Sequence, residues 1–239
     1  MSSRPALEIA VQDLAGLQAA HAGGADRVEV CSALLQTGGL TPSHGMVEAF
    51  VEAALLPVHV LIRCRPGDFV YDESEIDVMR RDILHFTDVG ATGVVIGALT
   101  SKGALAEGHL AALAEAAGSA TVTWHRMVDV LAEPVAAVHR AAVLGATRIL
   151  TSGGADTASR GEPQLAAMRD ACRAGIELMA GGGIRPEDVP ALVRVGVDAI
   201  HLSASRTVHG YPVGPGGGRT DRTVTDPAIV AAIAERLTR

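Results

Sequence analysis

The sequence predicts a single-domain α/β protein, a (β/α)8 barrel of the TIM type spanning residues 1–239. Short apolar segments with strand character alternate with longer helical segments along all 239 residues, and eight of each can be placed. A tripeptide of the Gly-Ala-Asp, Gly-Ala-Thr or Gly-Val-Asp type precedes every second strand. A doubly wound open sheet is the alternative. Its first strand would lead into a Gly-rich phosphate loop, whereas here it leads to Gln12-Asp13-Leu14.

The elements follow one another with clear boundaries. The predicted strands are Ala6–Val11, Arg27–Cys31, Val58–Cys64, Gly93–Leu99, Thr121–Arg126, Arg148–Ser152, Ile176–Ala180 and Ala199–Ser203. The predicted helices are Asp13–Ala22, His44–Ala54, Glu73–Val89, Glu107–Ala117, Glu133–Leu144, Glu162–Arg173, Pro186–Val195 and Pro227–Leu237. Glycine ends most of these helices, where a left-handed residue is favoured. The Gly-rich segment His209–Arg222 is interpreted as a lid over the barrel mouth or as a flexible linker.

The composition limits the classes of function. The chain is 48% hydrophobic, which is enough for one large core, but only 3% aromatic, so Ala, Val, Leu and Ile must build that core. The net charge is −7 without blocks of like charge, which argues against a nucleic-acid partner. No apolar run has the length of a membrane span, and the N-terminus lacks the features of a signal peptide. We therefore expect a cytoplasmic protein.

The second predicted strand carries charge where a buried strand is usually apolar. Because strand side chains alternate between faces, Arg27, Glu29 and Cys31 share one face and Val28 and Val30 the other. A carboxylate inside an apolar protein is costly unless it is paired. This strand therefore suggests a polar site inside the barrel.

Polar residues near the ends of other strands extend this pattern. In a barrel, residues at the C-terminal ends of the strands form the active site. The candidates are Glu8, Glu29, Cys31, Arg63, Arg65, His125, Arg126, Asp129, Thr151, Ser152, His201 and Ser203. We expect them to meet at one end of the barrel.

Each of these residues also has a purely structural interpretation. Glu8 and Arg63 could form a buried ion pair, and His125 and His201 could be satisfied core histidines. Arg27 belongs to the opposite end of its strand and is interpreted as a structural or surface charge. Cys31 could be a small buried apolar residue.

Glycine clusters point to an anion site. Backbone N–H groups at a Gly-rich turn bind anions, and barrels favour the loops after strands seven and eight for phosphate. Gly181, Gly182 and Gly183 fit that position, and Thr151 to Gly154 could add donors. The alternative is that these glycines only permit tight turns. The three cysteines have neither CxxC nor zinc-like spacing, so reduced thiols are expected. HExxH and HxH motifs, which would indicate a metal site, are also absent.

Seven motifs together resemble the CutC family, which is named for copper homeostasis. In chain order they are GGADRVEVCSALLQTGGLTPSHG, VLIRCRPGDFVYDESEIDVMRRDI, GVVIGALTSKG, TWHRMVD, TRILTSGG, ELMAGGGIRPEDV and HLSA. The resemblance runs from about Leu7 to Ser205, leaving 206–239 as a C-terminal loop and helix. It implies a TIM-like barrel, a cytoplasmic homo-oligomer (dimer or tetramer) and an association with copper.

The resemblance also carries individual residues. It implies functional roles for Glu8, Glu29, Cys31, Ser32, Arg63, Arg65, Asp68, His125, Arg126, Asp129, Thr151, Ser152 and His201. The chain departs from the family pattern at Cys64, where proline is usual, and at Trp124 in the TFHR-like run. Neither change removes an inward polar residue.

Three functions remain open from the sequence. A copper-handling protein would bind Cu(I) through Cys31, with His125 and His201 across the mouth. An enzyme of isomerase, lyase or hydrolase type would act on a small anionic, phosphorylated or sugar-derived substrate. Its general base would be Glu29 or Glu8, and its acid–base partner would be His125, oriented by Asp129 or a neighbour. Substrate would be bound by Arg63, Arg65, Arg126, Thr151, Ser152, Gly181, Gly182, Gly183 and His201. A non-catalytic ligand-binding barrel is the third.

Overall fold

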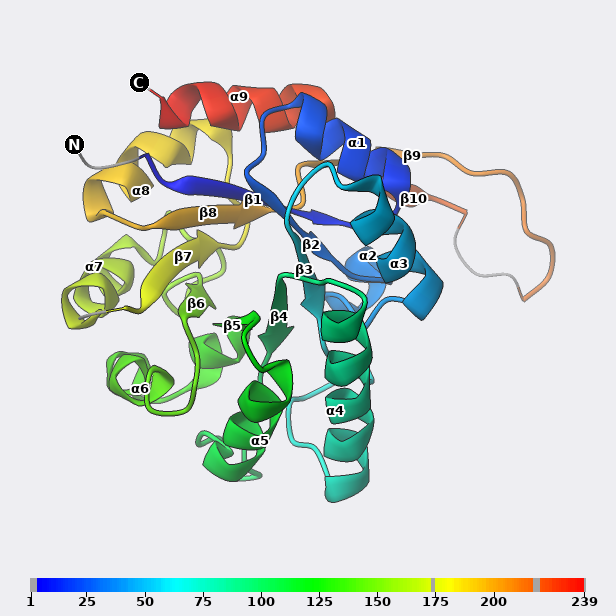
Figure 1. The fold of residues 1–239 in the computed structure, drawn as a ribbon. Helices are drawn as coiled ribbons and strands as arrows, with labels where there is room; N and C mark the ends of the chain where they lie inside the picture. The colour runs from blue at the N-terminus through cyan, green and yellow to red at the C-terminus, as the bar shows by residue number, and fades with distance from the viewer. Residues whose placement is uncertain (1–3, 173–174, 217–219, 239) are drawn as a thin grey trace.

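Eight parallel strands close into a barrel in sequence order, which confirms the predicted fold (Figure 1). The computed structural model describes residues 4–172, 175–216 and 220–238. The barrel strands are β1 (Ala6–Val11), β2 (Arg27–Val30), β3 (Val58–Leu61), β4 (Gly93–Ile96), β5 (Thr121–Trp124), β6 (Arg148–Thr151), β7 (Glu177–Gly181) and β8 (Ala199–Leu202). β8 pairs with β1 and completes the closure, which leaves no open edge in the barrel.

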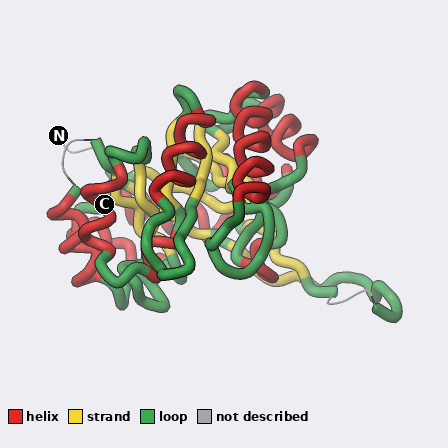
Figure 2. The backbone as a smooth tube through the Cα atoms, turned by 90° about the horizontal axis from the view of Figure 1, so that it is seen from below, coloured by secondary structure: helices red, strands yellow, loops and turns green. Residues whose placement is uncertain are grey.

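Helices surround the strands (Figure 2). They are α1 (Leu14–Ala22), α2 (Leu34–Thr37), α3 (His44–Ala53), α4 (Glu73–Asp88), α5 (Glu107–Ala117), α6 (Pro134–Ala141), α7 (Glu162–Ala171), α8 (Val189–Val195) and α9 (Pro227–Leu237). Two short 3-10 helices, η1 (Arg126–Val130) and η2 (Pro186–Asp188), precede α6 and α8. The predicted end of α7 at Arg173 lies outside the described residues.

Several strands end earlier than predicted, and this places some of the polar residues in loops. β3 ends at Leu61 and not at Cys64, because the amide N–H of Arg63 donates to the Thr41 hydroxyl at 2.8 Å and not to a neighbouring strand. β5 ends at Trp124, and His125 begins a 3-10 turn. Arg63 and His125 therefore belong to the segments after their strands, whereas Glu8, Glu29, Thr151 and His201 lie within strands.

The hydrophobic core lies between the strands and the helices. Its largest fully buried side chains include Trp124, Phe50 and Phe86, which are three of the chain's few aromatic residues. Val28 and Val30 of β2 belong to this outer core, as the alternation predicts. The inside of the barrel combines two small apolar clusters with buried polar residues, namely Glu8, Arg27, Glu29, His59, Thr123 and Arg148.

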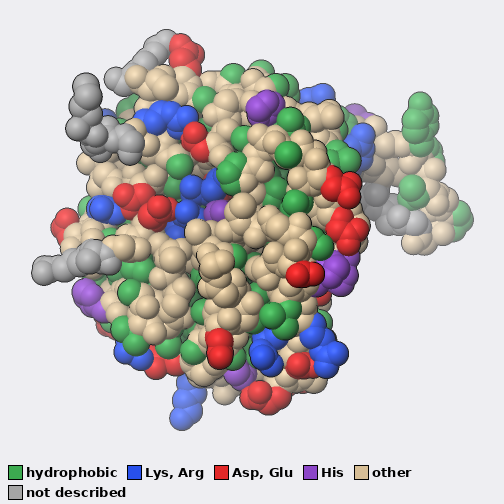
Figure 3. All heavy atoms as spheres, in the orientation of Figure 1, with side chains coloured by type: hydrophobic (Ala, Val, Ile, Leu, Met, Phe, Trp, Pro, Cys, Tyr) green, Lys and Arg blue, Asp and Glu red, His purple; other side chains and the backbone are tan. Residues whose placement is uncertain are grey.

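Along the chain, a two-stranded hairpin lies between the last barrel strand and the last helix. Strands β9 (Ser205–Val208) and β10 (Arg222–Thr225) pair in antiparallel fashion. The described part of their connection projects away from the barrel in both ribbon views (Figures 1 and 2). Figure 3 shows apolar side chains at its tip, where Tyr211 is 93% exposed. The described residues of the predicted lid segment therefore do not cover the mouth; residues 217–219 lie outside the description.

Among the described residues, no helix is long and apolar enough to cross a membrane. On the face seen in Figure 3, basic and acidic side chains are interspersed and form no continuous basic area.

Candidate functional site

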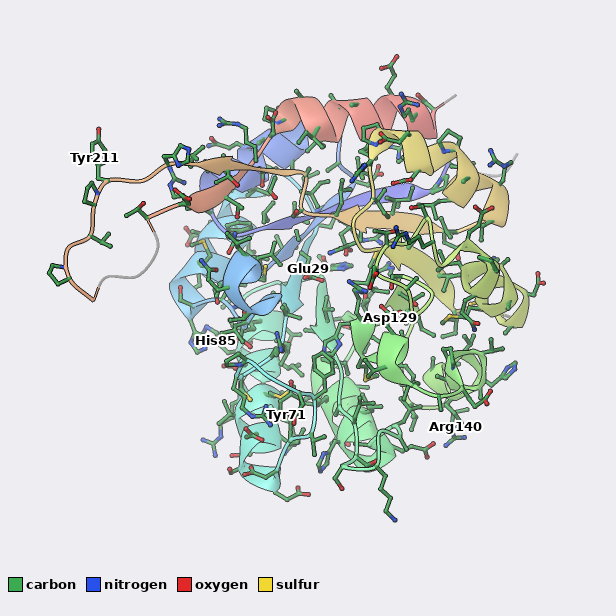
Figure 4. The ribbon with its side chains drawn as sticks, turned by 180° about the vertical axis from the view of Figure 1, so that it is seen from behind. Glu29, Tyr71, His85, Asp129, Arg140 and Tyr211 are labelled. Carbon is green, nitrogen blue, oxygen red and sulfur yellow. The ribbon has the colours of Figure 1, made fainter. Side chains whose placement is uncertain are left out.

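A cavity of about 860 Å³ opens at the C-terminal end of the barrel. The residues that line it come from strands β1, β2, β3, β6 and β8, from the segments after β2, β3, β5, β7 and β8, and from helix α9. Of the predicted site residues, Glu29, Arg63, His125, Arg126, Gly182, Gly183 and His201 line this cavity. Figure 4 shows Glu29 near the middle of the barrel.

Glu29 is a buried carboxylate that reaches the cavity. The residue is 5% exposed, and its Oε2 atom has no hydrogen-bond partner in the described part of the protein. Burial raises the pKa of Glu29 to about 7; the charge of His201 opposes this shift and that of Glu8 adds to it. Near neutral pH this carboxyl group can therefore both accept and release a proton.

Glu8 and His201 form a hydrogen-bonded pair close to Glu29. Glu8 is fully buried, and its Oε1 lies 2.8 Å from His201 Nδ1. Its Oε2 contacts the guanidinium of Arg27 and lies 3.3 Å from His59 Nδ1. Burial alone would raise the pKa of Glu8, but hydrogen bonds with His201 and His59 and the charge of Arg27 hold it well below its usual value. Glu8 therefore stays ionised and bound to its partners, and it does not act as a general base.

His201 has the opposite tendency to an ordinary buried histidine. Burial disfavours its charged form, but the carboxylates of Glu29 and Glu8 outweigh burial and raise the pKa of His201. The protonated form of His201 is thereby favoured, and ligand atoms of Glu29 and His201 lie within 4.8 Å of one another.

The expected ion pair between Glu8 and Arg63 is wrong. Glu8 lies beside Arg27 in the register of β1 and β2, so Arg27 is the partner that the sheet supplies. The interpretation of Arg27 as a structural charge is confirmed, although it lies inside the barrel and is only 9% exposed.

Arg63 binds the backbone of the mouth loops. Its guanidinium donates to the carbonyl oxygens of Thr37 (2.7 Å), Gly39 (2.9 Å) and Gly67 (2.7 Å), and its Nε has no partner in the described chain. The residue is 7% exposed. These bonds tie the loop after β2 to the loop after β3. Because carbonyls do not neutralise the guanidinium, a positive charge remains at the cavity wall.

His125 is a neutral imidazole. Its Nδ1 accepts a hydrogen bond from the Met127 N–H at 3.1 Å, so the ring proton lies on Nε2, which has no partner in the described chain. Burial and the charge of Arg63 lower the pKa of His125 to about 3. Its expected role as a titrating acid–base group oriented by Asp129 is therefore not what the structure shows: the amide of Met127 holds the ring instead.

Asp129 organises the loop after β6. Its carboxylate accepts hydrogen bonds from the Thr151 hydroxyl, from the Ser152 N–H (3.1 Å) and hydroxyl (3.0 Å), and from the Gly154 N–H (3.2 Å). It also accepts from Arg126 Nε at 2.7 Å, and Arg126 donates to Ser152 Oγ at 2.8 Å. Asp129, Thr151 and Ser152 are thus positioning residues for Arg126, and none of the three lines the cavity.

Arg126 and the glycine loop after β7 form one rim of the cavity. A Cβ atom at Gly182 would lie 3.2 Å from Arg126 Nη1, which shows how closely the guanidinium approaches the backbone there. Gly183 also lines the cavity, whereas Gly181 is the last residue of β7 and does not. A guanidinium beside glycine amides is suited to bind an anionic group.

The sequence interpretation missed part of this rim. Ser203, which the sequence offered as a candidate, lines the cavity, and so do Arg185 and Ser205, to which no site role was assigned. The position of Arg185 and Ser205 after β7 and β8, the loops that bind phosphate in many barrels, is the signal that could have found both.

Two expected site residues lie elsewhere. Arg65 forms ion pairs with Glu75 and with Asp68 (3.2 Å) and does not line the cavity. Cys31 is 1% exposed, and its Sγ lies 3.8 Å from the Val11 carbonyl oxygen. It packs with Leu61 and Val95, and burial raises the pKa of its thiol. The expectation that this thiol enters the cavity is therefore wrong.

Glu8, Glu29 and His201 are the one group in the described chain whose ligand atoms lie close enough, within 4.8 Å of one another, to hold a metal ion. However, both oxygens of Glu8 already contact Arg27, His59 or His201. Glu8 therefore has no oxygen left free for an ion, whereas Glu29 Oε2 remains without a partner in the described part of the protein.

Comparison with known proteins gives a consistent assignment. The CutC family model matches residues 6–206, close to the range of the sequence motifs. The family protein CutC of Mesorhizobium japonicum is 38% identical, with 95% of this chain and 92% of the relative covered. That of Xanthomonas campestris pv. campestris is 40% identical, with 97% and 98% covered.

Among solved structures, that of a candidate copper homeostasis protein, CutC from Streptococcus agalactiae, superposes with a TM-score of 0.78 at 27% identity, covering 83% of this chain and 98% of that one. The fold, the order of the motifs and the extent of these matches agree. The chain belongs to the CutC family.

Proposed function

We propose that this protein is an enzyme that transfers protons on a small organic anion bound in the cavity at the barrel mouth. The observation that carries the proposal is Glu29, a buried carboxyl group with an unpartnered oxygen, a pKa of about 7 and His201 beside it. A buried, unpaired carboxylate destabilises a fold, and such groups concentrate in active sites.

Each residue has a distinct role in this proposal. Glu29 accepts a proton from the bound molecule, and His201, charged through Glu8 and Glu29, returns one. Arg126 and the backbone of Gly182 and Gly183 hold the anionic group. Neutral His125 supplies an N–H donor from Nε2 and does not supply a proton as an imidazolium, because its pKa is too low. This combination supports isomerase or lyase chemistry.

Copper binding through Cys31 has less support. Cu(I) prefers thiolate ligands, and the Cys31 thiol is buried, packed among apolar side chains and disfavoured as a thiolate. Arg63 and Arg126 also place positive charge at the cavity, which suits an anion better than a cation.

The test is a thermal-shift screen of phosphates, phosphonates and carboxylates, followed by NMR detection of solvent deuterium incorporated into each ligand. We expect at least one anion to stabilise the wild-type protein and to gain deuterium. Arg126→Gln should weaken binding about tenfold, whereas Glu29→Gln should still bind the anion but lose deuterium incorporation.

The matched control is Arg160→Gln, a surface arginine paired with Asp156 at 3.7 Å and outside the cavity. It should behave as the wild type. If no anion stabilises the protein, or if Arg126→Gln binds as tightly as the wild type, the proposal fails.

A further inference from the structure

The cavity is larger than a small anion needs. Its volume of about 860 Å³ lies in the upper part of the range that encloses drug-sized ligands, roughly 300–1,000 Å³. A phosphate or a three-carbon acid held by Arg126 and Gly182 would leave most of this space unfilled. The chemistry of the remaining lining residues therefore indicates what the ligand carries besides its anionic group.

Part of the cavity wall is apolar. Leu34 of α2, Ile184 after β7, Leu202 of β8 and Ile229 and Ala232 of α9 all line the cavity. None of these side chains can donate or accept a hydrogen bond. The same cavity is thus lined by apolar side chains from four separate parts of the fold and by charged groups.

Apolar lining residues follow both groups directly along the chain. Ile184 directly follows Gly183 of the anion rim, and Leu202 directly follows His201 of the proton-transfer pair. Phe69 also lines the cavity, with its ring centroid 4.6 Å from that of His125. An aromatic ring at this place can pack against a planar or apolar group.

We propose that the ligand is an organic anion with an apolar body of at least aromatic-ring size, and not a sugar phosphate. This inference rests on the proposed function, because it names the substrate class of the same cavity. A sugar carries a hydroxyl group on most carbons, and each one buried against Leu34, Leu202 or Ile229 would lose its hydrogen bonds to water. An apolar body gains free energy from the same burial.

The test measures dissociation constants by isothermal titration calorimetry at fixed ionic strength for inorganic phosphate, glucose 6-phosphate and 1-naphthyl phosphate. We expect 1-naphthyl phosphate to bind about tenfold or more tightly than either of the others. Ile229→Asn, which makes the apolar wall polar, should remove most of this preference and leave the phosphate affinity within about twofold. Arg126→Gln should weaken phosphate and 1-naphthyl phosphate by a similar factor of about ten.

Ala231→Asn is the matched control. Ala231 lies on the same helix as Ile229, is exposed and does not line the cavity, so this variant should bind all three probes as the wild type does. A preference for glucose 6-phosphate, or a naphthyl preference that survives in Ile229→Asn, overturns the inference and leaves the proposed function standing. If none of the three phosphates binds, the inference is contradicted, while the proposed function still depends on the wider screen of phosphates, phosphonates and carboxylates.

Discussion

At the scale of single residues, four buried ionisable groups have different protonation behaviour because their neighbours differ. Glu8 contacts Arg27, His59 and His201 and is held ionised, whereas Glu29 lacks a comparable partner and keeps its proton to about pH 7. Both carboxylates raise the pKa of His201, whereas burial and the charge of Arg63 lower the pKa of His125. Residue type alone would give the two carboxylates the same pKa, and the two imidazoles the same pKa.

The pH dependence of stability tests the environment of Glu29. Its folded pKa of about 7 lies above the ordinary value of 4.5, so the folded state holds the proton more tightly than the unfolded state. The stability from this group is fully present below about pH 4.5 and is lost as the pH rises through about 7. Glu29→Gln, which cannot ionise, should therefore be more stable than the wild type at pH 8 by about 1–3 kcal/mol.

Urea unfolding at pH 8 and at pH 4.5 measures this difference, and the gain should be absent at pH 4.5. Glu115→Gln on α5, at an exposed position, serves as the control and should change stability by no more than about 0.5 kcal/mol at either pH. A Glu29→Gln variant that is less stable than the wild type at pH 8 would show that ionised Glu29 is well compensated.

At the scale of elements, short loops determine what each strand presents to the cavity. The sequence predicted the order of strands and helices, and most helix boundaries agree within a few residues. It overestimated the lengths of β3, β4 and β5, because apolar residues continue past the point where backbone hydrogen bonding to the neighbouring strand stops. The mouth loops are stabilised instead by side-chain contacts such as those of Arg63 and Asp129, which local patterns do not encode.

Gly97, the residue after β4, makes room for His125. A Cβ atom at this position would lie 2.1 Å from His125 Cε1 and 2.5 Å from Nε2. Gly97→Ala should therefore displace the imidazole ring and destabilise the protein by about 1–3 kcal/mol. Urea unfolding measures the loss, and the NMR chemical shifts of the His125 ring report the displacement.

Gly108→Ala on α5 is the corresponding control, since a Cβ there meets nothing within 4 Å. Alanine favours a helix over glycine, so this variant should be stabilised by about 0.5–1 kcal/mol. Unchanged His125 shifts in Gly97→Ala would show that the ring does not depend on this glycine.

At the scale of the whole molecule, barrel closure brings together residues from distant parts of the chain. Glu8 and His201 are separated by 193 positions and meet because β8 pairs with β1. The inside of the barrel thereby holds a charged network beside two small apolar clusters, where a mainly apolar interior is usual. This network supports the residues at the mouth and makes the stability of the barrel depend on its ion pairs.

Removing Arg27 tests this dependence. Arg27→Leu would leave the fully buried carboxylate of Glu8 without its main cation, which should destabilise the protein by about 3–5 kcal/mol. Arg81→Leu is the control, because Arg81 and Asp77 form a surface pair whose side chains are 77% and 50% exposed. Its effect should stay within about 0.5 kcal/mol. Thermal or urea unfolding measures the stability of both variants. If Arg27→Leu loses no more stability than Arg81→Leu, the other partners of Glu8 compensate its charge.

The sequence by itself determined the repeat of strands and helices, the inward face of Arg27, Glu29 and Cys31, the mouth of the barrel as the place of the site, and the family. These follow from periodicity, turn residues and motifs, all of which are local. Only the tertiary structure decided that Glu8 pairs with Arg27 and not Arg63, and that Cys31 is covered by apolar neighbours and does not line the cavity. It also decided that Asp129 binds Arg126 and does not orient His125, and that α9 supplies apolar side chains to the cavity. The physical reason is that pairing, depth and protonation depend on distances across the closed barrel, and these arise when strands far apart in the chain become neighbours.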